Sequence, residues 1–196
     1  MQRSALFIDA GYLKKLTRSR LHDAKVDFNF LFHALSEPTE LIQTYYYDCY
    51  PYQSVPPSLS EIEKMARKQR FFIALSRIPK LNVRLGRLER FGTPPLAYYR
   101  PRRFEGLIAV DALTLAFTRQ IDQMIFVAGN ADYCPILRAV RGEGVKVILW
   151  HGPKGKGTST TVHEELWVTA DERHELQAGF LNSLLPTSSM KPIKIV

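Results

Sequence analysis

The chain has 196 residues, 45% of them hydrophobic, and its 27 lysines and arginines outnumber 19 acidic residues to give a net charge of +8. This length and apolar content predict one globular domain with a sizeable core and exclude a long disordered segment. The net positive charge favours a polyanionic partner, and nucleic acid is the first class to consider.

The chain offers no sequence signal for a membrane or for export. Its apolar runs are all shorter than a membrane span, so no membrane partner is expected. The apolar stretch near the N-terminus is short, is interrupted by Asp9 and lacks the cleavage site of a signal peptide. Cys49 and Cys134 form no CxxC pair, which fits two buried thiols in a reducing compartment. A cytoplasmic location is therefore expected.

In the first half of the chain, apolar runs alternate with helical patterns. Asp27 is expected to cap one helix, and Ser60 followed by Glu63 resembles a capping box at the start of another. The expected elements are a strand at 4–8 ending in Asp9, a helix from 11 to about 20, a helix at 28–35, a strand at 41–50 and a helix at 60–75.

The second half continues the alternation. The expected elements are a hairpin of 83–88 with 96–99, a helix at 107–117, a strand at 125–128, a helix at 133–140, a strand at 145–150, a loop at 152–161 and a helix at 162–170. Alternating strands and helices predict an α/β fold with a mostly parallel sheet and helices on both faces. Residues 1–180 are assigned to this domain and 181–196 to a C-terminal tail.

Acidic and amide side chains stand where ligands of such sheets bind, at the carboxyl ends of strands. Asp9 closes the first strand, and Asn130 and Asp132 follow the strand at 125–128. Glu105 and Asp111 lie in or near the helix at 107–117. Carboxylates that converge on one crevice repel unless a cation compensates them, and Mg²⁺ or Mn²⁺ prefers oxygen ligands. Phosphodiester hydrolysis suits such a site when basic residues hold the phosphates.

Each acid also has an ordinary structural explanation. Asp9 and Asp132 stand where they can cap the helices that follow them. Glu105 near a helix start is favoured by the helix dipole. Asp111, inside an apolar helix segment, needs either a metal or a partner such as an arginine.

Basic residues gather in several short clusters, which favours a surface that follows phosphates. The loop at 152–161 has no Walker A spacing, but it suits an anion-binding loop or a plain surface loop. Tyr98 and Tyr99 are candidates for base stacking or for packing. The candidate nucleic-acid contacts are Lys14, Arg100, Arg102, Arg103, Lys154 and Lys156.

Five segments together resemble the bacterial NYN domains, in the LabA-like branch of the PIN-like nucleases. The segments occur in the order of the family and span roughly residues 4 to 175. They are FIDAGYL, YYYDCYPY, EGLIAVDALTLA, AGNADYCPILRAVRGEGVKVILW and HEELWVTADE.

The resemblance implies a Rossmann-like PIN/NYN three-layer sandwich with a Mg²⁺- or Mn²⁺-dependent ribonuclease site, and a homodimer is compatible with it. It implies metal-binding acids at Asp9, Asp111 and Asp132. Glu105 stands where the family usually has Asp, and Asn130 replaces the first Asp of an Asp-x-Asp pair. Asparagine keeps an oxygen ligand but removes a negative charge, which should weaken metal binding.

The leading hypothesis is therefore a metal-dependent endoribonuclease that acts on single-stranded or structured RNA. Asp9, Asp111 and Asp132 would hold the ion, with help from Glu105 and Asn130. The alternative, motivated by Asn130, is an RNA-binding or regulatory NYN module with weak or no catalysis. A metal-dependent phosphatase or nucleotide hydrolase is a third possibility, although Asp9 lacks the nucleophilic Asp-x-Asp pattern of the commonest phosphatase scheme.

Overall fold

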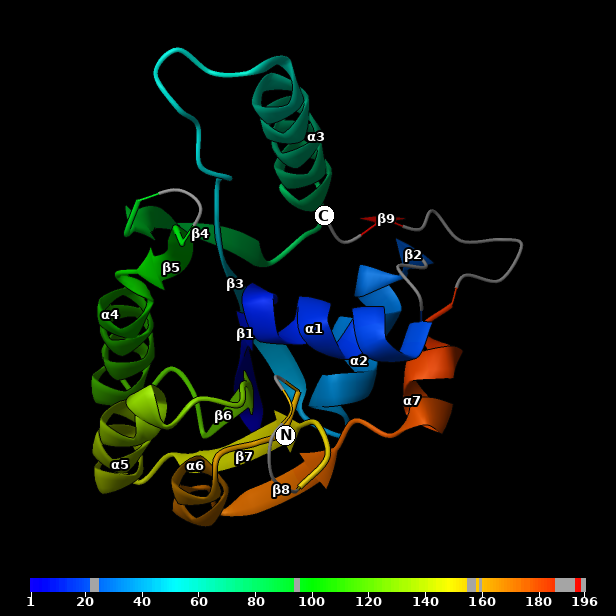
Figure 1. The fold of residues 1–196 in the computed structure, drawn as a ribbon. Helices are drawn as coiled ribbons and strands as arrows, with labels where there is room; N and C mark the ends of the chain where they lie inside the picture. Colours follow the sequence, from blue (N-terminus) through cyan, green and yellow to red (C-terminus); the bar gives the residue numbers. More distant parts are fainter. Residues whose placement is uncertain (22–24, 94–95, 155–157, 159, 186–192, 195–196) are drawn as a thin grey trace.

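A seven-stranded sheet forms the centre of the protein in the computed structural model (Figure 1). In spatial order its strands are β5 (Tyr98–Arg102), β4 (Leu81–Phe91), β3 (Glu40–Cys49), β1 (Arg3–Asp9), β6 (Gln123–Val127), β7 (Lys146–His151) and β8 (Glu172–Glu175). Neighbouring strands are parallel except for β4 and β5, which form the antiparallel hairpin. The structure describes residues 1–21, 25–93, 96–154, 158, 160–185 and 193–194.

Helices cover both faces of the sheet, as the alternating pattern predicted (Figure 1). One face carries α4 (Phe104–Phe117), α5 (Cys134–Gly142) and α6 (Glu164–Thr169). The opposite face carries α1 (Ala10–Leu21), α2 (Phe28–Ser36), α3 (Leu59–Leu75) and α7 (Ala178–Ser183). The result is the expected three-layer α/β sandwich with a mostly parallel sheet.

The central strand β1 is buried on both sides, which explains its continuous apolar run. Ala5 and Phe7 pack into the cluster on the α4 side, and Leu6 and Ile8 pack into the cluster on the α1 side. Successive side chains of a strand point to opposite faces, so the stretch from Ala5 to Ile8, which lies between two helical layers, is apolar at every position. The first polar residue of this run, Asp9, therefore falls where β1 leaves the core.

Two local expectations differ from the structure. The capping box of α3 joins Ser58 and Glu61, not Ser60 and Glu63. Ser58 has the extended backbone of a cap and accepts from the backbone N–H of Glu61, whereas Ser60 already lies in the first turn. The hairpin strands are displaced as well: β4 continues to Phe91, and β5 begins at Tyr98 because its pairing partner extends that far.

Part of the C-terminal region packs against the domain. Residue 180 falls within α7, and Leu181 and Leu184 are fully buried among the residues of the α1 side. Farther on, β9 (Ile193–Lys194) pairs antiparallel with β2 (Lys25–Val26). No helix in the described part of the chain is long and apolar enough to cross a membrane.

Candidate active site

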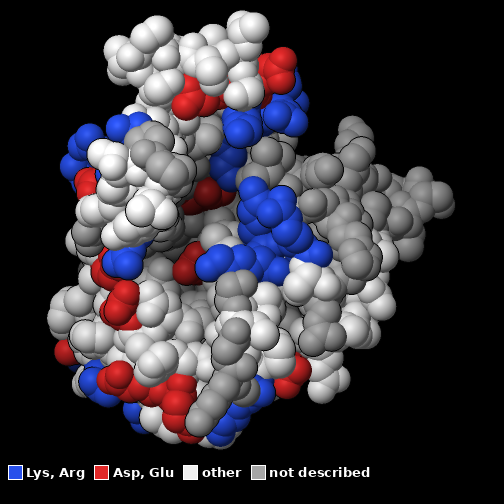
Figure 2. Space-filling model, in the orientation of Figure 1, with Lys and Arg blue, Asp and Glu red and all other residues white. Residues whose placement is uncertain are grey.

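A cavity of about 760 Å³ opens at the carboxyl ends of the central strands. Asp9 ends β1, and the segment from Gly129 to Tyr133 follows β6, so both strands deliver polar groups to this cavity. The chain passes from β1 to β3 on one side and reaches β6 on the other, and such a reversal of strand order leaves a crevice for ligands. Figure 2 shows a hollow with acidic side chains inside it and basic side chains beside it.

Asp9 is half-buried at the base of this cavity and is held by two donors. Its Oδ1 accepts from the backbone N–H of Tyr12 at 3.0 Å, and its Oδ2 accepts from the hydroxyl of Tyr133 at 2.9 Å. Burial raises the pKa of Asp9, while these hydrogen bonds and the charge of Lys15 oppose the rise. A half-buried carboxylate with fixed oxygens is suited to bind a cation that would offset its desolvation.

Asn130 and Asp132 lie together on the turn after β6. The Asn130 side chain caps the short helix η1 (Ala131–Tyr133): its Oδ1 accepts from the backbone N–H of Asp132 at 3.3 Å. Its Nδ2 donates to Asp132 Oδ2 at 2.7 Å. Both residues are exposed and line the cavity, so the Asn130 amide occupies one Asp132 oxygen at the site itself.

Glu105 also lines the cavity, from the first turn of α4. It is exposed, and Arg103 before it adopts a left-handed backbone with φ of 75°. The structure thus brings four of the five predicted polar site residues into one cavity. They come from β1, α4 and the turn after β6, and they are Asp9, Glu105, Asn130 and Asp132.

Asp111, the fifth, does not line the cavity. Both of its oxygens are bound by Arg84, with Nε at 2.9 Å from Oδ2 and Nη2 at 2.8 Å from Oδ1. The Tyr47 hydroxyl donates to Oδ2 at 3.0 Å. The arginine partner considered for this acid is therefore present, and it lies on β4, far from Asp111 in sequence.

The candidate nucleic-acid contacts have different locations. Arg100 lines the cavity, with its guanidinium 5.2 Å from the centre of the Tyr98 ring. Arg103 is exposed, and Lys14 lines a neighbouring groove. Lys154 turns toward α6, where its Nζ lies 3.4 Å from Glu164 and 3.7 Å from the centre of the Trp167 ring. The Arg102 side chain and Lys156 lie outside the described part of the structure.

Several residues around the site had no assigned role in the sequence. Lys15 lines the cavity from α1, and Tyr133 and His163 line it from the opposite side. The sequence held one usable signal for Tyr133, because it directly follows Asp132 on the turn after a strand. No signal in the sequence singled out Lys15, because Lys15 belongs to a basic run whose side chains point in different directions around a helix.

Tyr12 ties the cavity wall to the loop after β7. Its hydroxyl accepts from the backbone N–H of Gly152 at 2.8 Å and donates to the carbonyl of Thr160 at 2.9 Å. Burial raises the pKa of Tyr12 to about 12, so the phenol stays neutral and can make both bonds. Gly129 is required beside it, since a Cβ there would lie 2.2 Å from the Tyr12 ring.

The cavity offers oxygen donors to the expected divalent cation, but its described side chains do not surround an ion on all sides. Within the described ranges, no three Asp, Glu, His or Cys side chains converge closely enough to hold a metal ion. Mg²⁺ commonly uses one or two carboxylates and completes its coordination with water and substrate phosphates. Asp9 and Asp132 line the same cavity and offer carboxylate oxygens of the kind that such an ion uses, but the described residues do not form a site built entirely from protein ligands.

Comparisons with known proteins agree with this architecture. The crystal structure of a protein of unknown function from Vibrio parahaemolyticus is similar, with a TM-score of 0.62 and 17% identity over 90% of this chain and 93% of that chain. At this identity the likeness shows the fold alone. None of the curated proteins is a significant match. Residues 3–165 match the model of the NYN domain, and because this match covers most of the chain, the protein belongs to the NYN domain family.

Proposed function

We propose that this protein is a ribonuclease that hydrolyses RNA phosphodiester bonds with Mg²⁺ or Mn²⁺. One observation carries the proposal: Asp9, Glu105 and Asp132 line a single cavity that also holds the basic side chains of Lys15 and Arg100. Acidic groups at the base with cations beside them suit a phosphate diester, whose charge needs compensation on both sides of the reacting phosphorus. Membership of the NYN family supports a hydrolase of this class.

Asp9 and Asp132 would hold the ion, which when bound would polarise a phosphoryl oxygen. The chain's own groups do the rest. Tyr133 fixes the orientation of Asp9 through the bond to Oδ2. Lys15 and Arg100 bind the phosphate oxygens of the RNA. Glu105 accepts the proton of the attacking water as the new P–O bond forms. The leaving oxygen departs with the electron pair of the broken P–O bond and takes a proton from solvent water.

A second function is favoured by the contact between Asn130 and Asp132. The amide donates to Asp132 at 2.7 Å and so competes with a cation for that oxygen. This site has one carboxylate fewer than an Asp-x-Asp pair, and one oxygen of Asp132 already accepts a hydrogen bond from Asn130. Such a site would bind metal weakly. The same basic surface would then make this protein an RNA-binding module with little turnover.

The test is cleavage of purified single-stranded and structured RNA with Mn²⁺, Mg²⁺ or a chelator. Wild type is compared with Asp132→Asn, and Glu143→Gln at the exposed end of α5 serves as the matched loss of one carboxylate. Metal-dependent cleavage by wild type and Glu143→Gln, lost in Asp132→Asn, supports the ribonuclease. RNA binding without cleavage under any metal supports the binding module, and equal cleavage by all three proteins contradicts the site.

A further inference from the structure

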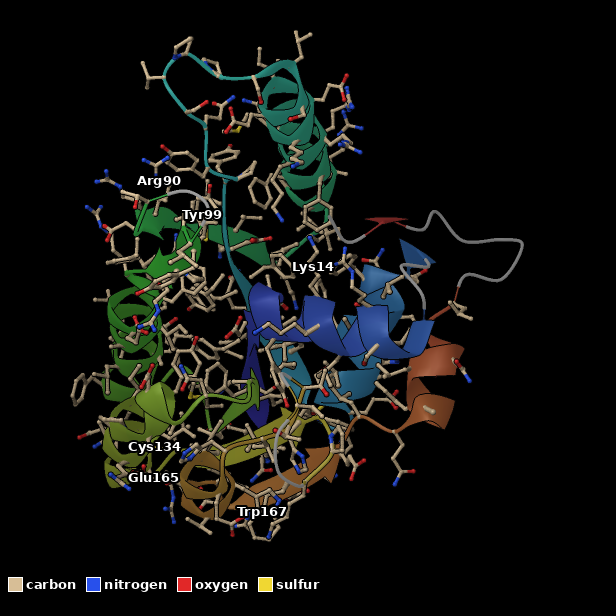
Figure 3. All side chains as sticks on the ribbon, in the orientation of Figure 1. Lys14, Arg90, Tyr99, Cys134, Glu165 and Trp167 are labelled. Carbon is tan, nitrogen blue, oxygen red and sulfur yellow. The ribbon has the colours of Figure 1, made fainter. Side chains whose placement is uncertain are left out.

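A second concave surface adjoins the candidate active site. It is a groove of about 450 Å³ between α1 and α3, which we call the α1–α3 groove. Gly11 and Leu88 line both this groove and the cavity, so the two are continuous. Figure 2 shows basic side chains running beside the acidic hollow toward the helix at the top of the view, and Figure 3 places Lys14 between α1 and α3.

The lining of the α1–α3 groove is strongly basic. Its only acid within the described residues is Asp48, against five basic side chains from two helices, Lys14, Arg18, Lys64, Arg67 and Lys68. Lys68 is buried and bound to Asp48 at 2.6 Å, so this pair balances its own charge and fastens α3 to β3. Counted over its described lining, the groove therefore has more cations than acids, and the other four basic side chains are Lys14, Arg18, Lys64 and Arg67.

These four charges form two facing rows. Lys14 and Arg18 are four residues apart on α1, and Lys64 and Arg67 are three apart on α3, so each pair shares one helix face. A single small anion needs one cluster of donors. Two spaced rows that begin at a cavity suit a linear series of phosphates, as in the backbone of a nucleic acid strand.

On the side of the cavity away from α1, the β4–β5 hairpin carries exposed aromatic rings. Tyr99 lines the cavity and is 48% exposed, and its ring lies 5.3 Å from that of Tyr52. Figure 3 shows Tyr99 and Arg90 on the β4–β5 hairpin, across from Lys14. Aromatic rings stack on unpaired bases, whereas the bases of a duplex are already stacked on one another. Exposed rings beside the cavity, next to the basic α1–α3 groove, therefore favour a single strand.

We propose that the α1–α3 groove binds the phosphate backbone of single-stranded RNA next to the segment that occupies the cavity. The inference rests on the proposed function for the identity of the ligand, but the groove acts in binding and not in the chemistry. RNA long enough to reach from the cavity into the groove therefore binds more tightly than RNA that fills the cavity alone.

The test compares two double variants with the same change of charge. Lys64→Gln/Arg67→Gln removes the α3 row, and Arg70→Gln/Arg77→Gln removes two exposed arginines outside the groove. Affinity for a fluorescent single-stranded RNA is measured by anisotropy in chelator, so that no cleavage is needed. The groove variant should bind roughly tenfold more weakly, and its slope of log affinity against log salt should fall by about 1.4, since each lost phosphate contact contributes about 0.7. The control variant should bind like wild type.

Three other results would each contradict a different part of the proposal. Equal losses in the two variants overturn the groove, because the effect would then be one of net charge. An equal loss for duplex RNA overturns the single-strand assignment. Lost binding to anionic lipid vesicles with unchanged RNA affinity overturns the RNA assignment. Thermal unfolding of both variants is expected at the wild-type temperature, since all four side chains are exposed.

The same experiments distinguish an error in the groove proposal from an error in the ribonuclease proposal. If wild type cleaves RNA and Lys64→Gln/Arg67→Gln binds RNA like wild type, the groove is wrong and the nuclease stands. If the groove variant loses binding while wild type cleaves no RNA with any metal, the groove stands and the nuclease is wrong. If both hold, KM for a long single strand rises in the groove variant, while hydrolysis of a dinucleotide is unchanged.

Discussion

Arg84 on β4 binds both carboxylate oxygens of Asp111 on α4, at 2.9 and 2.8 Å. The Asp111 side chain is 10% exposed and that of Arg84 is 39% exposed, so the pair lies between a surface and a buried ion pair. It links the outer part of the sheet to the helix that presents Glu105. The pair gives Asp111 a structural partner.

Asp111→Asn is expected to lower the free energy of unfolding by roughly 1–3 kcal/mol, between the values for exposed and buried pairs, because the Arg84 guanidinium loses its charged acceptor. Urea unfolding measures the change. Asp132→Asn, an exposed carboxylate, should shift the stability by less than about 0.5 kcal/mol. Unchanged stability in Asp111→Asn together with lost metal-dependent cleavage would instead make Asp111 a metal ligand, as the resemblance to the NYN domains implied.

Asp9→Asn should raise stability at neutral pH while it abolishes cleavage. The raised pKa of Asp9 means that the folded protein keeps a proton over a pH range in which the unfolded chain has lost it. Wild-type stability therefore falls as pH rises from the ordinary aspartate range through the folded pKa of Asp9. Asparagine has no charge to desolvate, so the variant avoids this loss. The difference in urea unfolding should disappear at acid pH, where Asp9 is protonated in both states.

The same variant tests cation binding without activity. Mg²⁺ or Mn²⁺ should raise the melting temperature of wild type at neutral pH, because an ion that binds only the folded state stabilises it. Asp9→Asn should show a much smaller rise. An equal rise in both proteins would mean that the ion binds elsewhere.

Asn130→Asp should strengthen metal binding by about tenfold, because it adds a charged ligand and removes the amide that donates to Asp132. Without metal the variant should be less stable than wild type, since two adjacent carboxylates repel each other. Titration of Mn²⁺ against cleavage rate and against melting temperature measures both effects. Unchanged metal dependence would show that Asn130 does not limit the site.

Tyr133→Phe tests a positioning residue. The Tyr133 hydroxyl donates to Asp9 Oδ2 and lowers the pKa of that carboxyl. Its loss should raise the pKa of Asp9 and shift the acid limb of the pH–rate profile to higher pH, with a fall in activity of roughly 10- to 100-fold. A merely structural role would lower stability and leave the position of that limb unchanged. Tyr98→Phe, on the exposed hairpin, removes a matched hydroxyl and should leave the profile as in wild type.

The sequence by itself determined the layered α/β architecture and the placement of Asp9, Asn130 and Asp132. Fully apolar runs such as those of β1 and β6 must be buried on both faces. The polar residues that follow these runs must then lie at the carboxyl ends of the strands. Local signals of this kind depend on residues close together in the chain. The match of segment order to the NYN family rests on the same short stretches.

Only the tertiary structure decided which charged groups meet. Arg84 and Asp111 are 27 residues apart, and the α1–α3 groove joins basic runs from two helices that have β2, α2 and β3 between them in the chain. A charged side chain in the sequence shows neither its direction nor its partner. Both depend on the packing of elements that are distant in the chain. This packing places Asp111 against Arg84 and Lys154 over the Trp167 ring, and it directs Lys15 into the cavity.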